Sequence, residues 1–286
     1  MVLIQEKLHK QGYIADRSLS VTLQLVMELE KPLLVEGPAG VGKTELAKVL
    51  ASVLETKLIR LQCYEGLDTT TALYEWNYPK QMLYIRMSEN DFPTDEKKAP
   101  DIFDEQFLLR RPLLDAITED EKAPVLLIDE IDRADEAFEA FLLEVLGEFQ
   151  VTIPEWGTIK AQHKPYVILT SNRTRELSDA LRRRCLYEWI DYPDIEKETD
   201  ILRAKLPGIE KRLAKQVAST MQRLRDLPFY KPPGVAESLD WARALSMLVN
   251  ADDDELAVTD TLGCLVKDRN DWKLLTENID ILREVE

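Results

Sequence analysis

The chain has 286 residues, of which 45% are hydrophobic and 31% are charged. This length and composition fit one large or two modest globular domains and exclude a disordered chain. Lys and Arg total 37 against 53 Asp and Glu, so the formal charge is −16. Such an acidic surface repels phosphate backbones and anionic lipids, which disfavours non-specific binding to nucleic acid or to a membrane.

The three cysteines, Cys63, Cys185 and Cys264, lie far apart, and the chain has only two histidines. No cysteine pair has the spacing of a zinc site, so we expect reduced, mostly buried thiols and no structural zinc. The N-terminal residues become charged too early for the apolar core of a secretion signal, and no stretch is apolar enough to cross a membrane. These features favour a cytoplasmic protein.

Five short apolar runs bounded by turn residues are predicted to be β-strands. They cover residues 33–36, 57–63, 125–128, 166–169 and 186–190. Helical spacing of apolar residues between these runs, clearest over 46–54 and 137–149, predicts helices that cover a parallel sheet on both faces. The predicted fold class is therefore α/β, an αβα sandwich around a five-stranded parallel sheet.

The pattern changes after Tyr192-Pro193. The residues that follow have helical periodicity broken by prolines and glycines, which predicts a small all-helical domain. The expected domains are therefore residues 1–192 and 193–286. Within the first, residues 151–161 are expected to form a hairpin with Trp156 at its turn.

A glycine-rich segment follows the first predicted strand and fits the phosphate-binding pattern G-x-x-x-x-G-K-[ST]. It consists of Gly37, Pro38, Ala39, Gly40, Val41, Gly42, Lys43 and Thr44, and Glu45 comes next. The glycines let the backbone turn and aim its N–H groups inward, and the following helix adds the positive end of its dipole. We expect Lys43 to reach the β- and γ-phosphates of a nucleotide and Thr44 to offer its hydroxyl to Mg²⁺.

The third apolar run ends in two acids, Asp129 and Glu130. Ligands bind at the carboxyl ends of strands in open parallel sheets. Asp129 is therefore expected to hold Mg²⁺, and Glu130 to orient and deprotonate the attacking water. Asp132 is expected to cap the helix that begins near Asp135.

These motifs together resemble an AAA+ ATPase. The resemblance is carried by GPAGVGKTELAKVLA, LLIDEIDRA, ILTSN and ELSDALRRRC, and it extends from about Tyr13 to Arg243. Within that superfamily the chain resembles the MoxR group, and residues 60–86 resemble its branch associated with carbon monoxide dehydrogenase maturation. The resemblance implies ATP and Mg²⁺ as cofactors, and a helical lid as the second domain.

The resemblance also implies roles for two residues near the nucleotide. Asn172 matches the first sensor, which hydrogen-bonds the γ-phosphate or the attacking water; an asparagine that caps a turn is the alternative. Arg243, expected at the start of a helix, matches the second sensor, which reaches the γ-phosphate of its own subunit. An exposed helical arginine is the alternative reading.

Three arginines, Arg182, Arg183 and Arg184, follow a short helix predicted over 178–181. The family places here a finger arginine that is aimed at the nucleotide of the neighbouring subunit, and Arg184 matches it first and Arg183 second. A guanidinium suits this role because it is always charged and presents a rigid fork of donors. The alternative is a cluster that complements the helix dipole.

A finger that acts in trans implies a ring of subunits, expected to be a hexamer. The resembled group implies chaperone-like remodelling, with a partner that carries a von Willebrand factor A domain and a metalloenzyme as client. One alternative is a nucleic-acid motor or loader with the same core, which the charge of −16 disfavours. Another is a non-hydrolysing scaffold, which the intact Lys43, Asp129, Glu130 and Asn172 disfavour.

Overall fold

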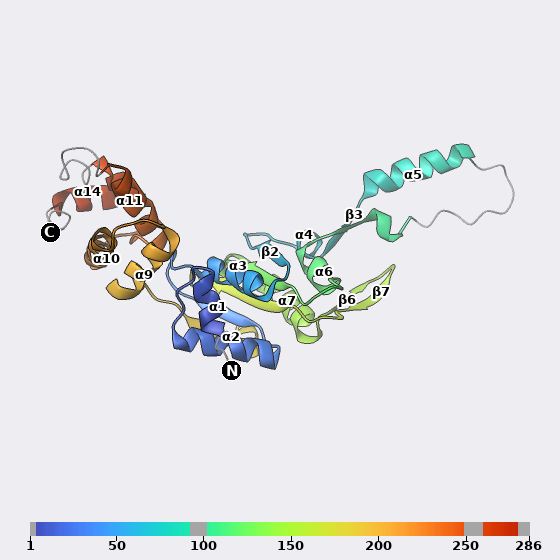
Figure 1. Ribbon diagram of the computed structural model, residues 1–286. Helices are drawn as coiled ribbons and strands as arrows, with labels where there is room; N and C mark the ends of the chain where they lie inside the picture. Colours follow the sequence, from blue (N-terminus) through green and yellow to red (C-terminus); the bar gives the residue numbers. More distant parts are fainter. Residues whose placement is uncertain (1–3, 92–101, 249–259, 280–286) are drawn as a thin grey trace. The chain divides into compact units, whose positions relative to one another are not determined.

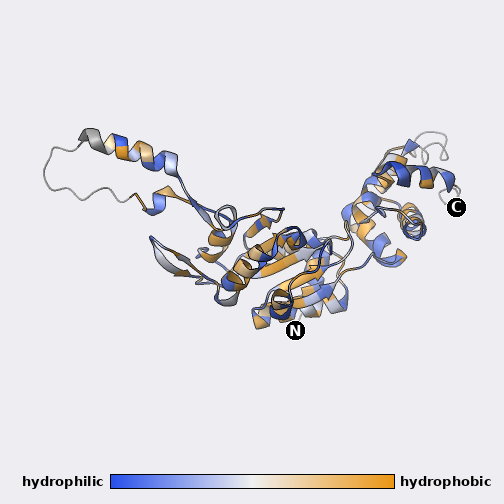
Figure 2. Ribbon diagram, turned by 180° about the vertical axis from the view of Figure 1, so that it is seen from behind, coloured by the Kyte–Doolittle hydropathy of each residue, from blue (hydrophilic) through white to orange (hydrophobic). Residues whose placement is uncertain are grey.

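A computed structural model describes residues 4–91, 102–248 and 260–279 (Figure 1). A five-stranded parallel sheet has the order β2-β5-β8-β1-β9. Its strands are β1 (Leu33–Glu36), β2 (Leu58–Gln62), β5 (Val125–Asp129), β8 (Tyr166–Ser171) and β9 (Leu186–Trp189). The predicted α/β class and the five predicted strands are confirmed. Hydrophobic residues concentrate in these strands, whereas the helices carry both hydrophilic and hydrophobic residues (Figure 2).

The chain divides into two compact units. The first unit comprises Met1–Gln24, Val35–Val53 and Glu188–Glu286, and the second comprises Leu25–Leu34 and Leu54–Tyr187. The boundary expected between residues 192 and 193 stays a prediction.

The first unit contains the N-terminal helix, the helix after the glycine-rich loop and the C-terminal helices. These are α1 (Ile4–Lys10), α3 (Lys43–Leu54), α9 (Ile195–Lys205), α10 (Lys211–Arg225), α11 (Val235–Leu248), α13 (Leu262–Leu265) and α14 (Arg269–Glu277); α2 (Arg17–Leu29) begins in this unit. Helix α10 buries Ala214, Val217, Met221 and Leu224, a spacing of three and four residues that forms one apolar stripe. This stripe belongs to the same core as the fully buried Trp241 of α11.

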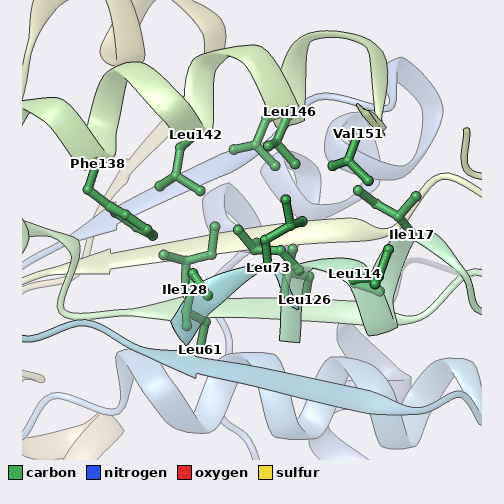
Figure 3. Close-up of a cluster of buried hydrophobic side chains, with 14 of the residues drawn as sticks. Leu61, Leu73, Leu114, Ile117, Leu126, Ile128, Phe138, Leu142, Leu146 and Val151 are labelled. Atoms are coloured by element: carbon green, nitrogen blue, oxygen red, sulfur yellow. The ribbon is translucent and has the colours of Figure 1, made fainter. Parts of the chain in front are cut away.

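The second unit has its core between the sheet and α7 (Glu136–Glu148). Asp135 caps this helix by accepting a hydrogen bond from the backbone N–H of Phe138, 2.8 Å away. Figure 3 shows side chains of α7, such as Leu142, directed toward side chains of the strands, such as Leu126. The other helical elements of this unit are α4 (Thr69–Ala72), α5 (Tyr78–Asp91), η1 (Glu105–Phe107), α6 (Pro112–Ile117), η2 (Ile131–Arg133) and α8 (Asp179–Arg184).

Two small antiparallel strand pairs complete the second unit. The pair β6 (Gln150–Ile153) and β7 (Gly157–Lys160) is the predicted hairpin, and Trp156 in its turn is 37% exposed. The pair β3 (Tyr74–Trp76) and β4 (Leu108–Arg110) was not predicted. No helix in the described part of the chain is long and apolar enough to cross a membrane.

Candidate functional site

The glycine-rich loop connects β1 to α3, as the pattern predicts. A Cβ atom on Gly37 would lie 2.0 Å from the carbonyl oxygen of Ile190, so this position accepts only glycine. Gly40 has a φ of +78°, and a Cβ atom there would lie 3.0 Å from the Cα of Gly234. The loop is therefore a tight backbone cradle with no space for side chains at these two positions.

Lys43 begins α3 and folds back over the loop. Its side chain is buried, and its Nζ donates hydrogen bonds to the carbonyl oxygens of Gly37 (2.8 Å) and Pro38 (2.6 Å). These two bonds hold the ammonium of Lys43 against the backbone of the loop. Thr44, in the first turn of the same helix, presents a hydroxyl group.

Glu45, also in this first turn, is fixed to the C-terminal end of α9. Its Oε1 lies 2.6 Å from the Nζ of Lys205. Burial alone would raise the pKa of the Glu45 carboxyl, but the hydrogen bond and the charge of Lys205 outweigh burial and lower it. The helix that follows the loop is thus held by an ion pair to the C-terminal helical region of the same unit.

A second brace on the loop comes from the segment that precedes α11. The backbone N–H of Val235 donates to the carbonyl oxygen of Gly40 at 3.0 Å. The preceding Pro233 carbonyl accepts from Nε of Arg225 at 2.9 Å, and Arg225 also forms two bonds of 2.7 Å with Glu198. This network of hydrogen bonds connects the backbone of the glycine-rich loop to α9 and α10.

The acids of the second unit lie at the carboxyl end of β5. Asp129 is only 2% exposed. Its Oδ1 accepts a hydrogen bond from Oγ1 of Thr170 (2.6 Å), and its Oδ2 accepts from Nε (3.1 Å) and Nη2 (2.6 Å) of Arg60. The same Thr170 oxygen accepts from the backbone N–H of Glu130 at 2.9 Å. Thr170 of β8 therefore holds both acids of β5 in place.

Glu130 sits in the left-handed region with φ 56° and ψ 50°, which turns the chain sharply at the end of β5. Its Oε2 accepts from Nε2 of Gln62 at 3.0 Å and from Nη1 of Arg133 at 3.1 Å. The carboxylate is one-third exposed, so it combines fixed partners with access to water. This geometry suits a general base.

The expected helix-capping role of Asp132 is wrong, since Asp135 caps α7. Asp132 is buried, and its Oδ2 accepts from the backbone N–H groups of Asn172 (3.2 Å) and Thr174 (2.8 Å). Asp132 therefore fixes the loop after β8 to the loop after β5. The Asn172 side chain, partly exposed, projects from this fixed backbone.

The three arginines occupy the last turn of α8, not the segment after it as expected. Arg182, Arg183 and Arg184 are all exposed, and Nη1 of Arg184 donates to the carbonyl oxygen of Ala180 at 3.4 Å. Arg184 also lines a cavity of about 220 Å³. Arg243 is exposed in the C-terminal half of α11, not at a helix start as expected.

Sequence reasoning missed Arg60, Gln62 and Thr170. A signal for two of them exists in β2, where the polar Arg60 and Gln62 alternate with the buried Ile59 and Leu61. Alternate residues of a strand point to the same face. The two polar side chains therefore share one face of β2, beside the strand that carries the acids.

Residues 33–190 match the family model described as the ATPase family associated with various cellular activities (AAA). The chain belongs to the AAA family. The prediction of an AAA+ protein is confirmed at this level, and the MoxR branch stays a prediction.

Relatives of this AAA protein include uncharacterized proteins of two staphylococci. The protein from Staphylococcus haemolyticus is 25% identical over 282 residues, which cover 95% of this chain and 98% of the relative. The one from Staphylococcus epidermidis is 24% identical over 276 residues, covering 93% and 96% of the two chains. These matches extend the likeness beyond the AAA segment to nearly the whole chain.

Among solved structures, two point mutants of Thermotoga maritima RuvB are similar, with TM-scores of 0.55 and 0.53. They are 21% and 22% identical, and they cover 98% of this chain and 78% and 77% of their own. At this identity the likeness shows a common fold alone.

The residues of the AAA protein fit a magnesium nucleotide chemically. Phosphate groups are bound by the N–H groups of a glycine-rich backbone, by an ammonium and by the start of a helix. Mg²⁺ is bound by carboxylate and hydroxyl oxygens. Within the described residues, no group of three or more His, Cys, Asp or Glu side chains is arranged to hold a metal ion. Mg²⁺ commonly has few protein ligands and shares its coordination with water and phosphate, which agrees with this donor set.

Proposed function

We propose that this AAA protein is a Mg²⁺-dependent ATPase of the MoxR type that uses ATP hydrolysis to remodel a partner protein. The observation that carries the proposal is the cradle at Gly37 and Gly40 with the buried ammonium of Lys43 folded over it. A cradle of this kind binds the phosphates of a nucleotide. The membership in a family of ATPases supports hydrolysis as the reaction.

Each site residue has a proposed role. The loop residues from Gly37 to Thr44, together with Glu45, bind the nucleotide; Thr44 and Asp129 hold Mg²⁺. Glu130 activates water, and Asn172 positions it or the γ-phosphate. Lys43 and Arg243 stabilise phosphate charge in the same subunit, while Arg184, or Arg183 after it, does so in the neighbour.

The proposed assembly is a ring, expected to be a hexamer, because a finger that acts in trans needs a neighbouring subunit. The position of Arg182, Arg183 and Arg184 on an exposed helix turn supports this assembly, since these side chains are accessible to another copy. The helical region from residue 193 is proposed as the lid.

The proposed work is chaperone-like remodelling that matures a metalloenzyme, together with a partner that carries a von Willebrand factor A domain. This proposal rests on the resemblance of residues 60–86 to the maturation branch. The charge of −16 favours a protein as the client and disfavours a nucleic acid, whose phosphates it repels.

The test compares the wild-type protein with Glu130→Gln, which should bind ATP and fail to cleave it. We expect the wild type to release phosphate with Mg²⁺ and Glu130→Gln to lose about 10²- to 10⁴-fold of that rate. We also expect Glu130→Gln to retain a co-expressed von Willebrand factor A domain protein in ATP but not without it. Wild-type protein that releases no phosphate contradicts the ATPase proposal, and turnover that depends on added DNA contradicts the protein-client proposal.

A further inference from the structure

Arg60 of β2 forms an ion pair with the acid proposed to hold magnesium. Two of its nitrogens, Nε and Nη2, donate to the single oxygen Oδ2 of Asp129, at 3.1 and 2.6 Å. The side chain of Asp129 is 3% exposed, whereas that of Arg60 is 49% exposed. One partner is therefore fixed inside the unit, and the other has open space beside it.

The buried partner belongs to a cluster of acids. Besides burial, the charges of Asp129, Asp132 and Glu130 raise the pKa of the neighbouring Cys63 thiol to about 12, so their negative field extends through this region. A buried carboxylate in such a field is costly unless a cation compensates it. Arg60 supplies that positive charge at Asp129.

We propose that Arg60 is an internal counter-ion which Mg²⁺ displaces from Asp129 when the nucleotide binds. This inference rests on the proposed role of Asp129 in holding the metal. The oxygen that accepts two N–H bonds from Arg60 cannot at the same time serve a magnesium ion or its bound water. A guanidinium and a divalent cation at one carboxylate also repel each other.

The exposed side of the pair makes this exchange possible. Arg60 can rotate toward solvent without opening the core, because half of its side chain is already exposed; the rotation also gives up the hydrogen bond that its Nη2 donates to Oε1 of Gln62. When Arg60 leaves Asp129, Mg²⁺ replaces it as the counter-ion of the carboxylate. The ion pair therefore compensates the charge of Asp129 before the metal arrives, and competition from Arg60 lowers the apparent affinity of this carboxylate for Mg²⁺.

The alternative is that Arg60 only stabilises the pairing of β2 with β5. The two roles differ in their effect on Mg²⁺. If Arg60 competes with Mg²⁺, its removal lets Mg²⁺ bind more tightly. If Arg60 only stabilises the strand pairing, its removal leaves the Mg²⁺ affinity unchanged or lowers it by disturbing the site.

The experiment titrates Mg²⁺ into the wild-type protein and into Arg60→Gln, both in the presence of fluorescent ADP, and records the Mg²⁺ concentration that gives half-maximal signal. We expect this concentration to fall about two- to fivefold in Arg60→Gln, the range for loss of a partly exposed ion pair. Arg60→Lys keeps the positive charge but lacks the two parallel N–H donors of the guanidinium. Its half-saturating Mg²⁺ concentration should lie between those of the wild type and Arg60→Gln. Arg111→Gln is the matched control, because Arg111 forms a partly exposed ion pair with Glu75 at 2.6 Å elsewhere in the unit.

A second measurement uses thermal unfolding. Without Mg²⁺, Arg60→Gln should melt below the wild type because Asp129 lacks its counter-ion, and Mg²⁺ with ADP should narrow that difference. An unchanged or higher half-saturating Mg²⁺ concentration in Arg60→Gln, or in Arg60→Lys if the first variant does not fold, overturns the inference. A wild-type protein that binds no nucleotide instead overturns the proposed function, and the inference falls with it.

Discussion

Gly40 in the glycine-rich loop and Gly234 before α11 pack backbone against backbone. A Cβ atom on Gly234 would lie 2.8 Å from the Cα of Gly40 and 3.0 Å from the carbonyl oxygen of Ala39. The bond from the Val235 N–H to the Gly40 carbonyl fixes the same contact. The shape of the glycine-rich loop therefore depends on a glycine that lies far along the chain in the C-terminal helical region.

Replacement of Gly234 by alanine should break this contact. Backbone atoms on both sides would have to move, and overpacking of this kind costs about 1 to 3 kcal/mol. We expect Gly234→Ala to lower both the free energy of unfolding and the affinity for nucleotide. Gly147→Ala is the control, since a Cβ atom there meets nothing within 4 Å and alanine favours a helix. A Gly234→Ala protein with unchanged stability and nucleotide affinity would show that the loop does not need the contact.

Removal of one partner of the buried ion pair between Arg225 and Glu198 should strongly destabilise the helical region. Their side chains are 7% and 0% exposed. Arg225→Ala leaves the Glu198 charge buried without its partner, which costs about 3 to 5 kcal/mol. Lys197→Ala removes a more exposed pair with Asp16 and should cost at most about 1 kcal/mol. Urea unfolding of both variants tests the contrast, and equal losses would contradict it.

Arg184 is predicted to act on the nucleotide of a neighbouring subunit. Arg184→Ala should leave ATP binding intact and reduce hydrolysis by about 10³-fold or more, the effect typical of an arginine finger. Arg182→Ala, in the same helix turn, should retain most of the activity. Phosphate release is measured on variants whose oligomeric state has been verified by sedimentation. Full turnover by an oligomeric Arg184→Ala protein would transfer the role to another arginine.

Cys63 is predicted to be unreactive in the folded protein. Burial, followed by the charges of the nearby acids, raises its pKa from 9.0 to about 12. The thiol should therefore react with a disulfide reagent at pH 8 only after unfolding, whereas the partly exposed Cys264 should react at once. Because the unfolded state loses this proton first, the contribution of Cys63 to stability is present below pH 9 and declines toward pH 12. Rapid labelling of Cys63 in the native state would contradict its burial.

The central elements of the fold were predictable because their signals are local. Apolar runs such as 125–128 fit a strand buried on both faces, and the glycine pattern from Gly37 to Thr44 fixes a strand, a turn and a helix in order. Asp129 and Glu130 were found for the same reason, since they end a buried strand.

The contacts that were missed join residues far apart in the sequence. The three-residue strands β3 and β4 pair across more than thirty positions, and no local pattern predicts such a register. Gly234 looks like an ordinary turn glycine in the sequence, and Arg60 looks like an exposed strand residue. Only the fold brings the first to Gly40 and the second to Asp129.

The most direct test of the account is calorimetric titration of ATP with Mg²⁺ into the wild-type protein, Lys43→Ala and Lys48→Ala. Lys48 lies in the same helix but is largely exposed, so it serves as the control. We predict saturable binding to the wild type and to Lys48→Ala, and a loss of at least about tenfold in affinity for Lys43→Ala. Absence of binding to the wild type, or equal binding by all three, would contradict a phosphate site in this loop.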